Sequence, residues 1–403
     1  MQSSILVVLN RLVHLLILFF ISSTAVAASI EELMLAGNNL RLKGNVAAAN
    51  QIKDQIRELA PGDPASYAFN LNTIITELSW EESQRRFDDQ LIGDAKQLIA
   101  LCESGAASAS GINNADYYCG QAYFSLSFYN GIRGNYIRAG RNGTTAIDYL
   151  EAALKRQPDL IRAKMYLGIA YYYADNLPHF IKLFSKVLWF IPSGNSAKSL
   201  PYLRDVMASD DAFSDVARYI YATLLINGSE DEVQDALSEI DILIKRYPEN
   251  ARFQLRYVSV ILGNDQFLAT LDRINAYMAT EYGKNLSMID TNLLSIWLAR
   301  AHLGLGQVEE AIRVRQRIQF DPVNTTVPSW GLAWYEFTGG QLEDLIGNRE
   351  AAIESYKRVL ALDDTTFVNP KLVAMARAAI STPYVLPATL PIDASNAAGL
   401  EQE

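Results

Sequence analysis

The chain has 403 residues, of which 50% are hydrophobic and 20% are charged, and its formal net charge is −10. This length is sufficient for a large core or a long stacked array. The acidic charge argues against an extended phosphate-binding surface, so we expect a protein that does not bind nucleic acid.

The first 27 residues have the order of a secretory signal peptide: a basic residue, an apolar run at 12–21, and small residues up to Ala27. Arg11 and His14 interrupt the apolar segment, which disfavours a membrane-spanning helix of about 20 residues. The sequence therefore predicts cleavage after Ala27 and export, with the periplasm as the expected location. An uncleaved N-terminal membrane anchor is the alternative, and we expect membrane contact only through this segment.

After residue 27, hydrophobic residues recur at helical intervals between short turns. Gly37 and Pro61 lie 24 residues apart, as do Gly168 and Pro192, and this equal spacing indicates a repeated helical hairpin. The hairpin from Ala163 is predicted as a helix, a tight turn and a second helix that Pro192 ends. The other predicted helices, in chain order, are one capped by Ser29, 64–78, 84–102, a pair within 113–158, a short helix capped by Ser199 with Pro201 in its first turn, 215–226, 230–247, 250–262, 266–282, 292–305, 308–320, a hairpin ending at 363–364, and a capping helix at 370–380.

The hairpin at 113–158 is longer than the others, by about 14 residues relative to a regular unit of about 34. We predict its turn at Gly131–Gly134, with the additional residues forming nearly whole helical turns that keep each apolar face in register. Asn142 and Gly143 then lie inside the second helix, where we expect a bend.

Small, aromatic and proline residues mark the hairpin from Ala163 most clearly: Leu167, Gly168, Tyr171, Phe180, Phe184, Val187 and Pro192. With these anchors the chain resembles tetratricopeptide repeat (TPR) proteins, strongly at 161–192, 292–322 and 333–364 and more loosely over 30–364. A narrower likeness to exported bacterial TPR proteins with one lengthened hairpin runs through 117–123, 133–139, 150–154 and 171–178. Departures from the pattern are His302 and Arg315 at aromatic positions and Phe180 in place of alanine.

The resemblance implies an all-α fold, a right-handed superhelical solenoid of antiparallel helix pairs over residues 28–380. It also implies that the first helix of each pair lines a concave groove that binds a protein or peptide. From residue 381 to 403, prolines and small residues predict a disordered tail.

The only cysteines are Cys102 and Cys119. Export would permit a disulfide between them that joins neighbouring helices. The alternative is a pair of small buried residues, and the sequence does not choose between the two.

The sequence shows no constellation typical of catalysis. His14 lies in the predicted signal peptide, and His179 and His302 are far apart, so no histidine-rich metal site is expected. The phosphate-loop, nucleophile-elbow and zinc-protease motifs do not occur. We therefore predict a non-enzymatic protein without cofactor or metal.

Tyrosines are dense in the lengthened hairpin and the unit after it, and we expect most of them to pack between helices. Offsets from the glycine and alanine anchors of the resemblance place seven residues in the groove: Asn114, Tyr117, Gln121, Arg162, Tyr172, Tyr173 and Arg300. Arginines and amides there suit a peptide backbone or a carboxylate. The predicted function is an exported scaffold for protein or peptide partners in the cell envelope. The alternative is a small-molecule-binding component with the tyrosine-rich hairpin as its pocket.

Overall fold

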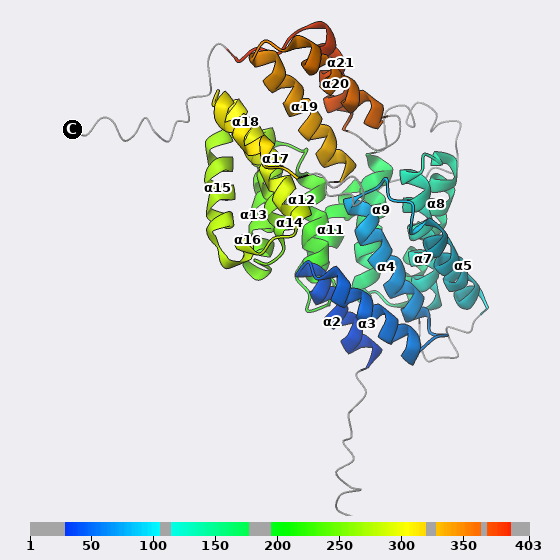
Figure 1. Cartoon of the computed structure of the whole chain (residues 1–403). Helices are drawn as coiled ribbons and strands as arrows, with labels where there is room; N and C mark the ends of the chain where they lie inside the picture. Colours follow the sequence, from blue (N-terminus) through cyan, green and yellow to red (C-terminus); the bar gives the residue numbers. More distant parts are fainter. Residues whose placement is uncertain (1–28, 105–113, 177–194, 320–327, 364–368, 388–403) are drawn as a thin grey trace, which may run out of the picture.

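The computed structural model describes residues 29–104, 114–176, 195–319, 328–363 and 369–387, and these form eighteen α-helices and no strand (Figure 1). The predicted all-α fold is confirmed. The helices are α2 (Ile30–Leu42), α3 (Val46–Leu59), α4 (Pro64–Trp80), α5 (Asp88–Glu103), α7 (Ala115–Ile132), α8 (Tyr136–Arg156), α9 (Ile161–Asp175), α11 (Ser196–Met207), α12 (Ser214–Leu225), α13 (Glu230–Arg246), α14 (Ala251–Gly263), α15 (Phe267–Ala279), α16 (Glu281–Lys284), α17 (Met288–Gly304), α18 (Val308–Gln316), α19 (Ser329–Leu345), α20 (Arg349–Asp363) and α21 (Pro370–Ser381).

Both ends of the chain extend past the described part. The predicted signal peptide at 1–27 lies outside it, and none of the helices within it is long and apolar enough to cross a membrane. The chain beyond residue 381 stays packed as far as Leu386. The backbone N–H of Tyr384 donates to Asp344 at 2.8 Å, and Tyr384 and Leu386 pack against the buried cluster of Leu303, Ala311 and Leu342.

Short polar signals in the sequence fix where several helices begin. Ser29 caps α2 and exchanges two hydrogen bonds with Glu32, and Ser229 does the same with Glu232 at the start of α13. Asp63 caps α4 and accepts from the N–H of Ala65 at 2.8 Å. Each cap satisfies backbone donors that the first helical turn leaves without a partner.

Five hairpins share one turn. Its central residue has a positive φ, and the next residue donates its N–H to the carbonyl five positions earlier, which ends the preceding helix as in a Schellman motif. In three successive hairpins this residue recurs at intervals of 41 residues, longer than the ~34 of a regular tetratricopeptide repeat. The five residues are Gly44 (78°), Gly134 (75°), Asp265 (58°), Gly306 (73°) and Gly347 (83°).

The lengthened hairpin has the predicted form. α7 and α8 contain 18 and 21 residues, and Gly134 is in the turn between them. Asn142 and Gly143 lie inside α8, as expected. A Cβ on Gly120 would lie 2.6 Å from the side chain of Leu150, so this glycine lets the two long helices approach closely.

The predicted second helix of the hairpin from Ala163, which Pro192 ends, lies outside the described residues and stays a prediction. In the structure α11 packs against α9, and a Cβ on Gly168 would lie 2.9 Å from the side chain of Leu203 in α11. The hydroxyl of Ser199 donates to the carbonyl of Gly168 at 2.8 Å, so Ser199 binds the neighbouring helix instead of capping its own.

A disulfide joins Cys102 of α5 to Cys119 of α7, whose Cα atoms are 5.8 Å apart. Closing a loop of this length between two helices stabilises a chain by about 3 kcal/mol in the loop-entropy description. At the opposite end of α5 and α7, Arg133 forms a bidentate ion pair with Asp88 (2.7 and 3.0 Å) and also donates to the carbonyls of Glu82 and Gln84. Together these bonds hold the lengthened hairpin against α4 and α5.

Each hairpin packs on the next one along the chain. Within the described residues there are eight pairs, with α21 packed on the last: α2/α3, α4/α5, α7/α8, α9/α11, α12/α13, α14/α15, α17/α18 and α19/α20. First helices contact the first helices that follow them, in the runs α4–α7–α9–α12 and α14–α17–α19. We call these seven helices the inner layer, because their side chains meet across the middle of the molecule.

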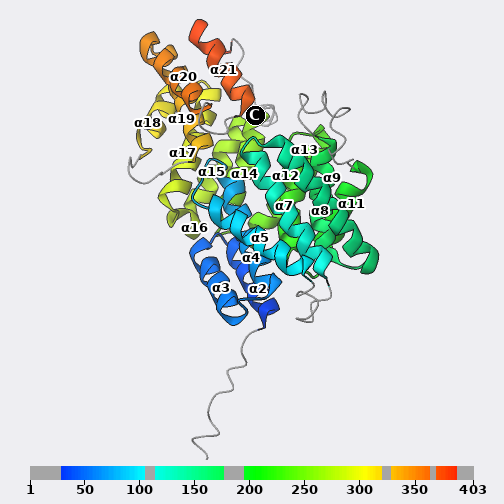
Figure 2. The same ribbon diagram turned by 90° about the vertical axis from the view of Figure 1, so that its right-hand side faces the viewer.

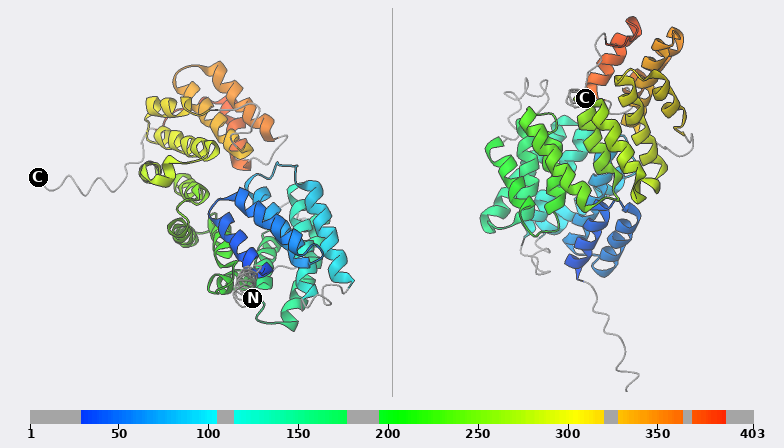
Figure 3. Two further views of the ribbon diagram at one scale, coloured as in Figure 1. Left: turned by 60° about the horizontal axis from the view of Figure 1, so that its bottom comes forward. Right: turned by 90° about the vertical axis from the view of Figure 1, so that its left-hand side faces the viewer.

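The array curves back on itself. Figure 2 shows the α17–α21 end and the α7–α11 part on opposite sides of the molecule. In the left view of Figure 3, the blue helices α2–α4 lie inside the curve of the cyan, green, yellow and orange ones. The first hairpins therefore occupy part of the space that the inner layer encloses.

Candidate binding site on the inner face

Hydrogen bonds from α9 and from the residue before α14 to the N-terminal helices α2 and α4 close the curve. The amide of Asn250, before α14, donates to the carbonyl of Leu42 at 2.7 Å. The phenol of Tyr166 in α9 donates to Asn72 of α4 at 2.6 Å. These bonds span 208 and 94 residues of sequence, so the N-terminal helices reach α9 and α14 directly.

Three of the seven predicted groove residues contact other side chains or backbone groups of the protein itself. Gln121 is buried and donates to the carbonyl of Ala68 at 2.9 Å. Tyr117 is buried, and its ring centroid lies 6.1 Å from that of Tyr166. The amide of Asn114 donates to Gln157 at 2.8 Å. Only Gln121 is covered by α4, whereas Tyr117 meets α9 and Asn114 meets the end of α8, and a role of these residues in a groove stays a prediction.

Arg162 braces the N-terminal helix against the start of α12. Its guanidinium pairs with Asp211 at 3.0 Å and with Glu31, and it lies 5.4 Å from the ring centroid of Phe213. Burial acts to lower the pKa of Arg162, but the bond to Glu31 and the nearby charges raise it overall. This arginine therefore serves the fold and is not available to a partner.

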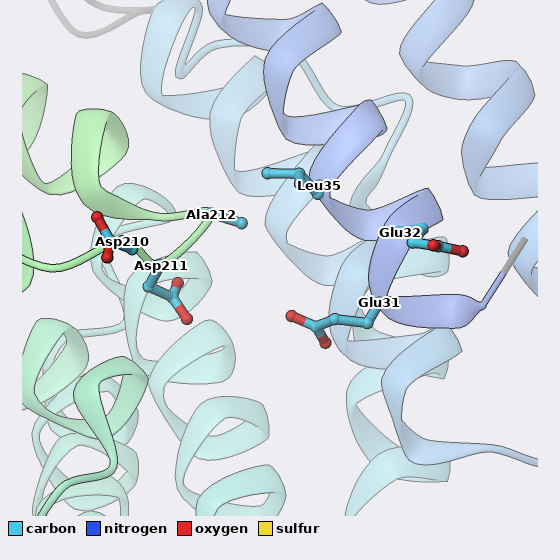
Figure 4. A pocket seen from close by; sticks show the side chains of 6 residues that line it. All are labelled: Glu31, Glu32, Leu35, Asp210, Asp211 and Ala212. Carbon is cyan, nitrogen blue, oxygen red and sulfur yellow. The ribbon is translucent and has the colours of Figure 1, made fainter.

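A shallow hollow lies beside this brace. It has a volume of about 190 Å³, and in Figure 4 the side chains of Glu31 and Asp211 point toward each other across it. The other lining residues are Glu32, Leu35, Asp210 and Ala212. A second hollow of about 260 Å³ lies next to Tyr277 and Tyr282 of α15 and α16. Both are smaller than the roughly 300 Å³ at which pockets for small molecules begin.

The two tyrosines at the end of α9 differ in their surroundings. The hydroxyl of Tyr172 donates to the carbonyl of Leu224 in α12 at 2.7 Å, which holds the two helices together. The side chain of Tyr173 is 57% exposed. Burial, then the charge of Glu82, raise the pKa of Tyr173, while Arg256 opposes them. Water thus reaches Tyr173 although protein surrounds it, as expected on the inner side of a curved array.

Arg300 of α17 is stacked among tryptophans. Its guanidinium carbon lies 3.6 Å from the ring centroid of Trp334 and 5.0 Å from that of Trp297. Within the described residues it forms no ion pair, and burial lowers its pKa to about 9, which the charge of Asp265 offsets only in part. The indole N–H of Trp297 is buried and also has no hydrogen-bond partner among the described residues.

A second group, formed by Tyr219 of α12 with Arg252 and Arg256 of α14, was not predicted from the sequence. The guanidinium of Arg256 donates to the hydroxyl of Tyr219 at 3.4 Å, and among the described residues it has no carboxylate within ion-pair distance. Arg252, one turn earlier, lies 4.0 Å from Glu77 and 4.5 Å from the ring centroid of Trp80. Burial raises the pKa of Tyr219, but the charge and hydrogen bond of Arg256, followed by the charge of Arg252, lower it overall. The local potential is therefore positive.

One regularity could have located this group. The offsets rely on a glycine or alanine anchor, and the α14–α15 turn carries Asp265 where the next two hairpins carry Gly306 and Gly347. Trp297 of α17, which contacts Arg300, lies 41 residues after Arg256, so the two residues hold the same position in successive hairpins. Arg256 thus occupies a repeated position on the inner layer.

Tyr173, Tyr219, Arg256 and Arg300, which we call the inner-face group, combine aromatic rings with arginines that lack acidic partners. Such a surface is suited to binding and contains no nucleophile with an adjacent base. The described part of the chain contains no cluster of three or more histidine, cysteine, aspartate or glutamate residues that could hold a metal ion.

No protein-family model matches the chain, and no curated protein is significantly similar to it.

Proposed function

We propose that the chain is a superhelical solenoid of the TPR type that binds a segment of a partner protein or peptide at its inner face, without catalysis. The anchors in the sequence support this, as do the eight stacked hairpins of the described residues and the turn that five of them share. The 41-residue interval is a departure that makes the C-terminal units longer than regular repeats.

We further propose that the protein is exported and acts in the cell envelope. The order of charged, apolar and small residues before Ala28 supports export. The disulfide between Cys102 and Cys119 also supports it, because disulfides persist mainly in oxidising compartments.

The observation that carries the binding proposal is the inner-face group itself. Tyrosine and arginine are enriched at positions that dominate the energy of protein interfaces, where their large side chains make both apolar and polar contacts. Tyr173 offers such a side chain at 57% exposure. The tyrosines of the lengthened hairpin do not favour the small-molecule alternative, since Tyr123 and Tyr149 stack on each other and both hollows described above lie elsewhere.

Affinity capture from a cell-envelope extract tests the proposal. We expect the wild-type protein to retain a defined partner, and the double variant Tyr173→Ala, Arg256→Gln to lose it. The control is Arg273→Gln on α15, because Arg273 is already paired with Asp241 at 2.8 Å and lies outside the inner layer. Equal capture by the wild type, the double variant and the control would place the binding surface elsewhere.

A further inference from the structure

Two arginines stand on successive turns of α14 and belong to one face of that helix. Arg252 and Arg256 are four residues apart, a spacing at which like charges disfavour a helix by a few tenths of a kcal/mol. Within the described residues Arg252 forms a long ion pair with Glu77 at 4.0 Å, whereas Arg256 donates to the phenol of Tyr219 at 3.4 Å and has no carboxylate within ion-pair distance. Two guanidinium groups thus share one side of α14 with a single acidic partner between them.

Arg256 is partly withdrawn from water and keeps its charge. It is half-buried, and the nearby Tyr219 outweighs burial and raises the pKa of Arg256. Arginines withdrawn from water are normally paired with a carboxylate or a phosphate, because an unpaired charge retains its full desolvation penalty. The chain as described does not supply that anion.

We propose that Arg252, Arg256 and Tyr219 form a binding site for the oxyanion group, carboxylate or phosphate, of an acidic ligand that enters the inner face. The guanidinium of Arg256 donates two parallel N–H groups, a geometry that matches both oxyanions. Tyr219, at 3.4 Å from Arg256, contributes its phenol O–H as a further donor. Arg252 adds a second positive charge one turn away.

This inference rests on the proposed function in placing the ligand at the inner face, and it adds the chemical class of the group that is bound. Because the chain has a net charge of −10, attraction of an acidic ligand depends on the local charges of Arg252 and Arg256 and not on the overall charge.

The test is calorimetric titration of the full mature protein with sodium phosphate and, separately, sodium acetate, each against sodium chloride at the same ionic strength. We expect saturable binding of at least one oxyanion, and affinity that is roughly tenfold to hundredfold weaker in Arg256→Gln because a charge-assisted hydrogen bond is lost. Phosphate binding without acetate binding identifies a phosphate group as the ligand chemistry, and the reverse result identifies a carboxylate. The control Arg273→Gln should bind as the wild type does.

A second readout protects against a variant that merely misfolds. A bound oxyanion neutralises the charge of Arg256, so it should raise the pH at which Tyr219 ionises in the wild type. The ionisation is followed by phenolate absorbance, and the part of the signal that Tyr219→Phe removes is assigned to Tyr219. Binding that is equal in the wild type and Arg256→Gln, or that leaves Tyr219 unchanged, means an adventitious ion only and overturns the inference. The proposed function fails separately if no protein is captured although the oxyanion binds.

Discussion

The indole N–H of Trp330 donates to the backbone carbonyl of Trp80 at 3.0 Å, and the two rings meet edge to face with centroids 5.4 Å apart. The bond joins the start of α19 to the end of α4 across 250 residues of sequence. Beside it, the backbone N–H and the hydroxyl of Ser329 both donate to Glu81 at 2.7 Å. This contact closes the curved array between the end of α4 and the start of α19.

Removing the indole N–H of Trp330 should weaken the contact between α4 and α19 while an aromatic ring still fills its place. Trp330→Phe keeps an aromatic ring against Trp80 but deletes the indole N–H, which leaves the carbonyl of Trp80 without that partner. We expect the free energy of unfolding, measured with urea, to fall by about 1 kcal/mol. In a double-mutant cycle with Glu81→Gln, the two changes should couple, because both residues belong to one contact. Strict additivity would mean that the two bonds act independently.

Replacement by methionine should change the free energy of unfolding differently at two arginines, Arg133 and Arg300. Arg133 is 5% exposed and paired with Asp88, so Arg133→Met strands a buried carboxylate and should lower the free energy of unfolding by about 3–5 kcal/mol. Arg300 has no acidic partner in the described chain, and methionine retains the contact with the tryptophans. Arg300→Met should therefore leave stability at pH 7 unchanged or raise it by about 1 kcal/mol.

The pH dependence of Arg300 follows from its pKa of about 9, which burial depresses far below the usual value of an arginine. Because the folded state releases this proton more easily than the unfolded state, the cost of the charge is fully present below pH 9. It is relieved as pH rises from about 9 towards the pKa of the unfolded state. The difference in stability between Arg300→Met and the wild type should therefore shrink above pH 9, in urea titrations at fixed pH. A constant difference from pH 7 to pH 11 would contradict a desolvated charge.

Loss of the disulfide should destabilise the N-terminal half of the chain. Cys102→Ser with Cys119→Ser removes the link between α5 and α7, and we expect a loss of about 2–4 kcal/mol. Thermal unfolding of the wild type with and without a reducing agent checks this, with the double variant as the reference that a reducing agent cannot change. A wild type that is unaffected by reduction, while its thiols titrate as free, would refute the stabilising role.

Tyr219 should ionise at a lower pH than its neighbours. Its pKa lies below 10 because Arg256 and Arg252 outweigh the effect of burial, whereas burial raises the pKa of Tyr221 and of Tyr277 to about 12. Since the folded state gives up the Tyr219 proton first, this residue contributes stability that grows as pH rises through its folded pKa and is complete above 10. Arg256→Gln should move the earliest phenolate absorbance to higher pH.

The local structure could be predicted from the sequence because helix caps, turn glycines and apolar periodicity act over a few residues. Ser29, Gly134 and Gly347 all mark the helix ends that the pattern predicts. The packing of α11 on α9 was not predicted, because the close approach that Gly168 permits does not specify which helix approaches.

The candidate site was only partly predictable. The offset from small anchor residues assigns Tyr173, Arg300 and Gln121 to one groove, but it carries no information on the first hairpins, which cover Gln121. The contact of Asn250 with Leu42 depends on the accumulated curvature of all the intervening hairpins. No local pattern encodes that sum, so the closure of the array required the structure.

Site-specific photo-crosslinking tests the proposed inner-face binding most directly. A photoreactive residue at position 173 should capture a partner in the cell envelope, and the same residue at position 136 should not, because Tyr136 is 43% exposed but begins α8, outside the inner layer. Peptide mapping of the crosslinked product should locate an acidic segment of the partner. Capture at position 136 with none at position 173 would contradict the inner face as the binding surface.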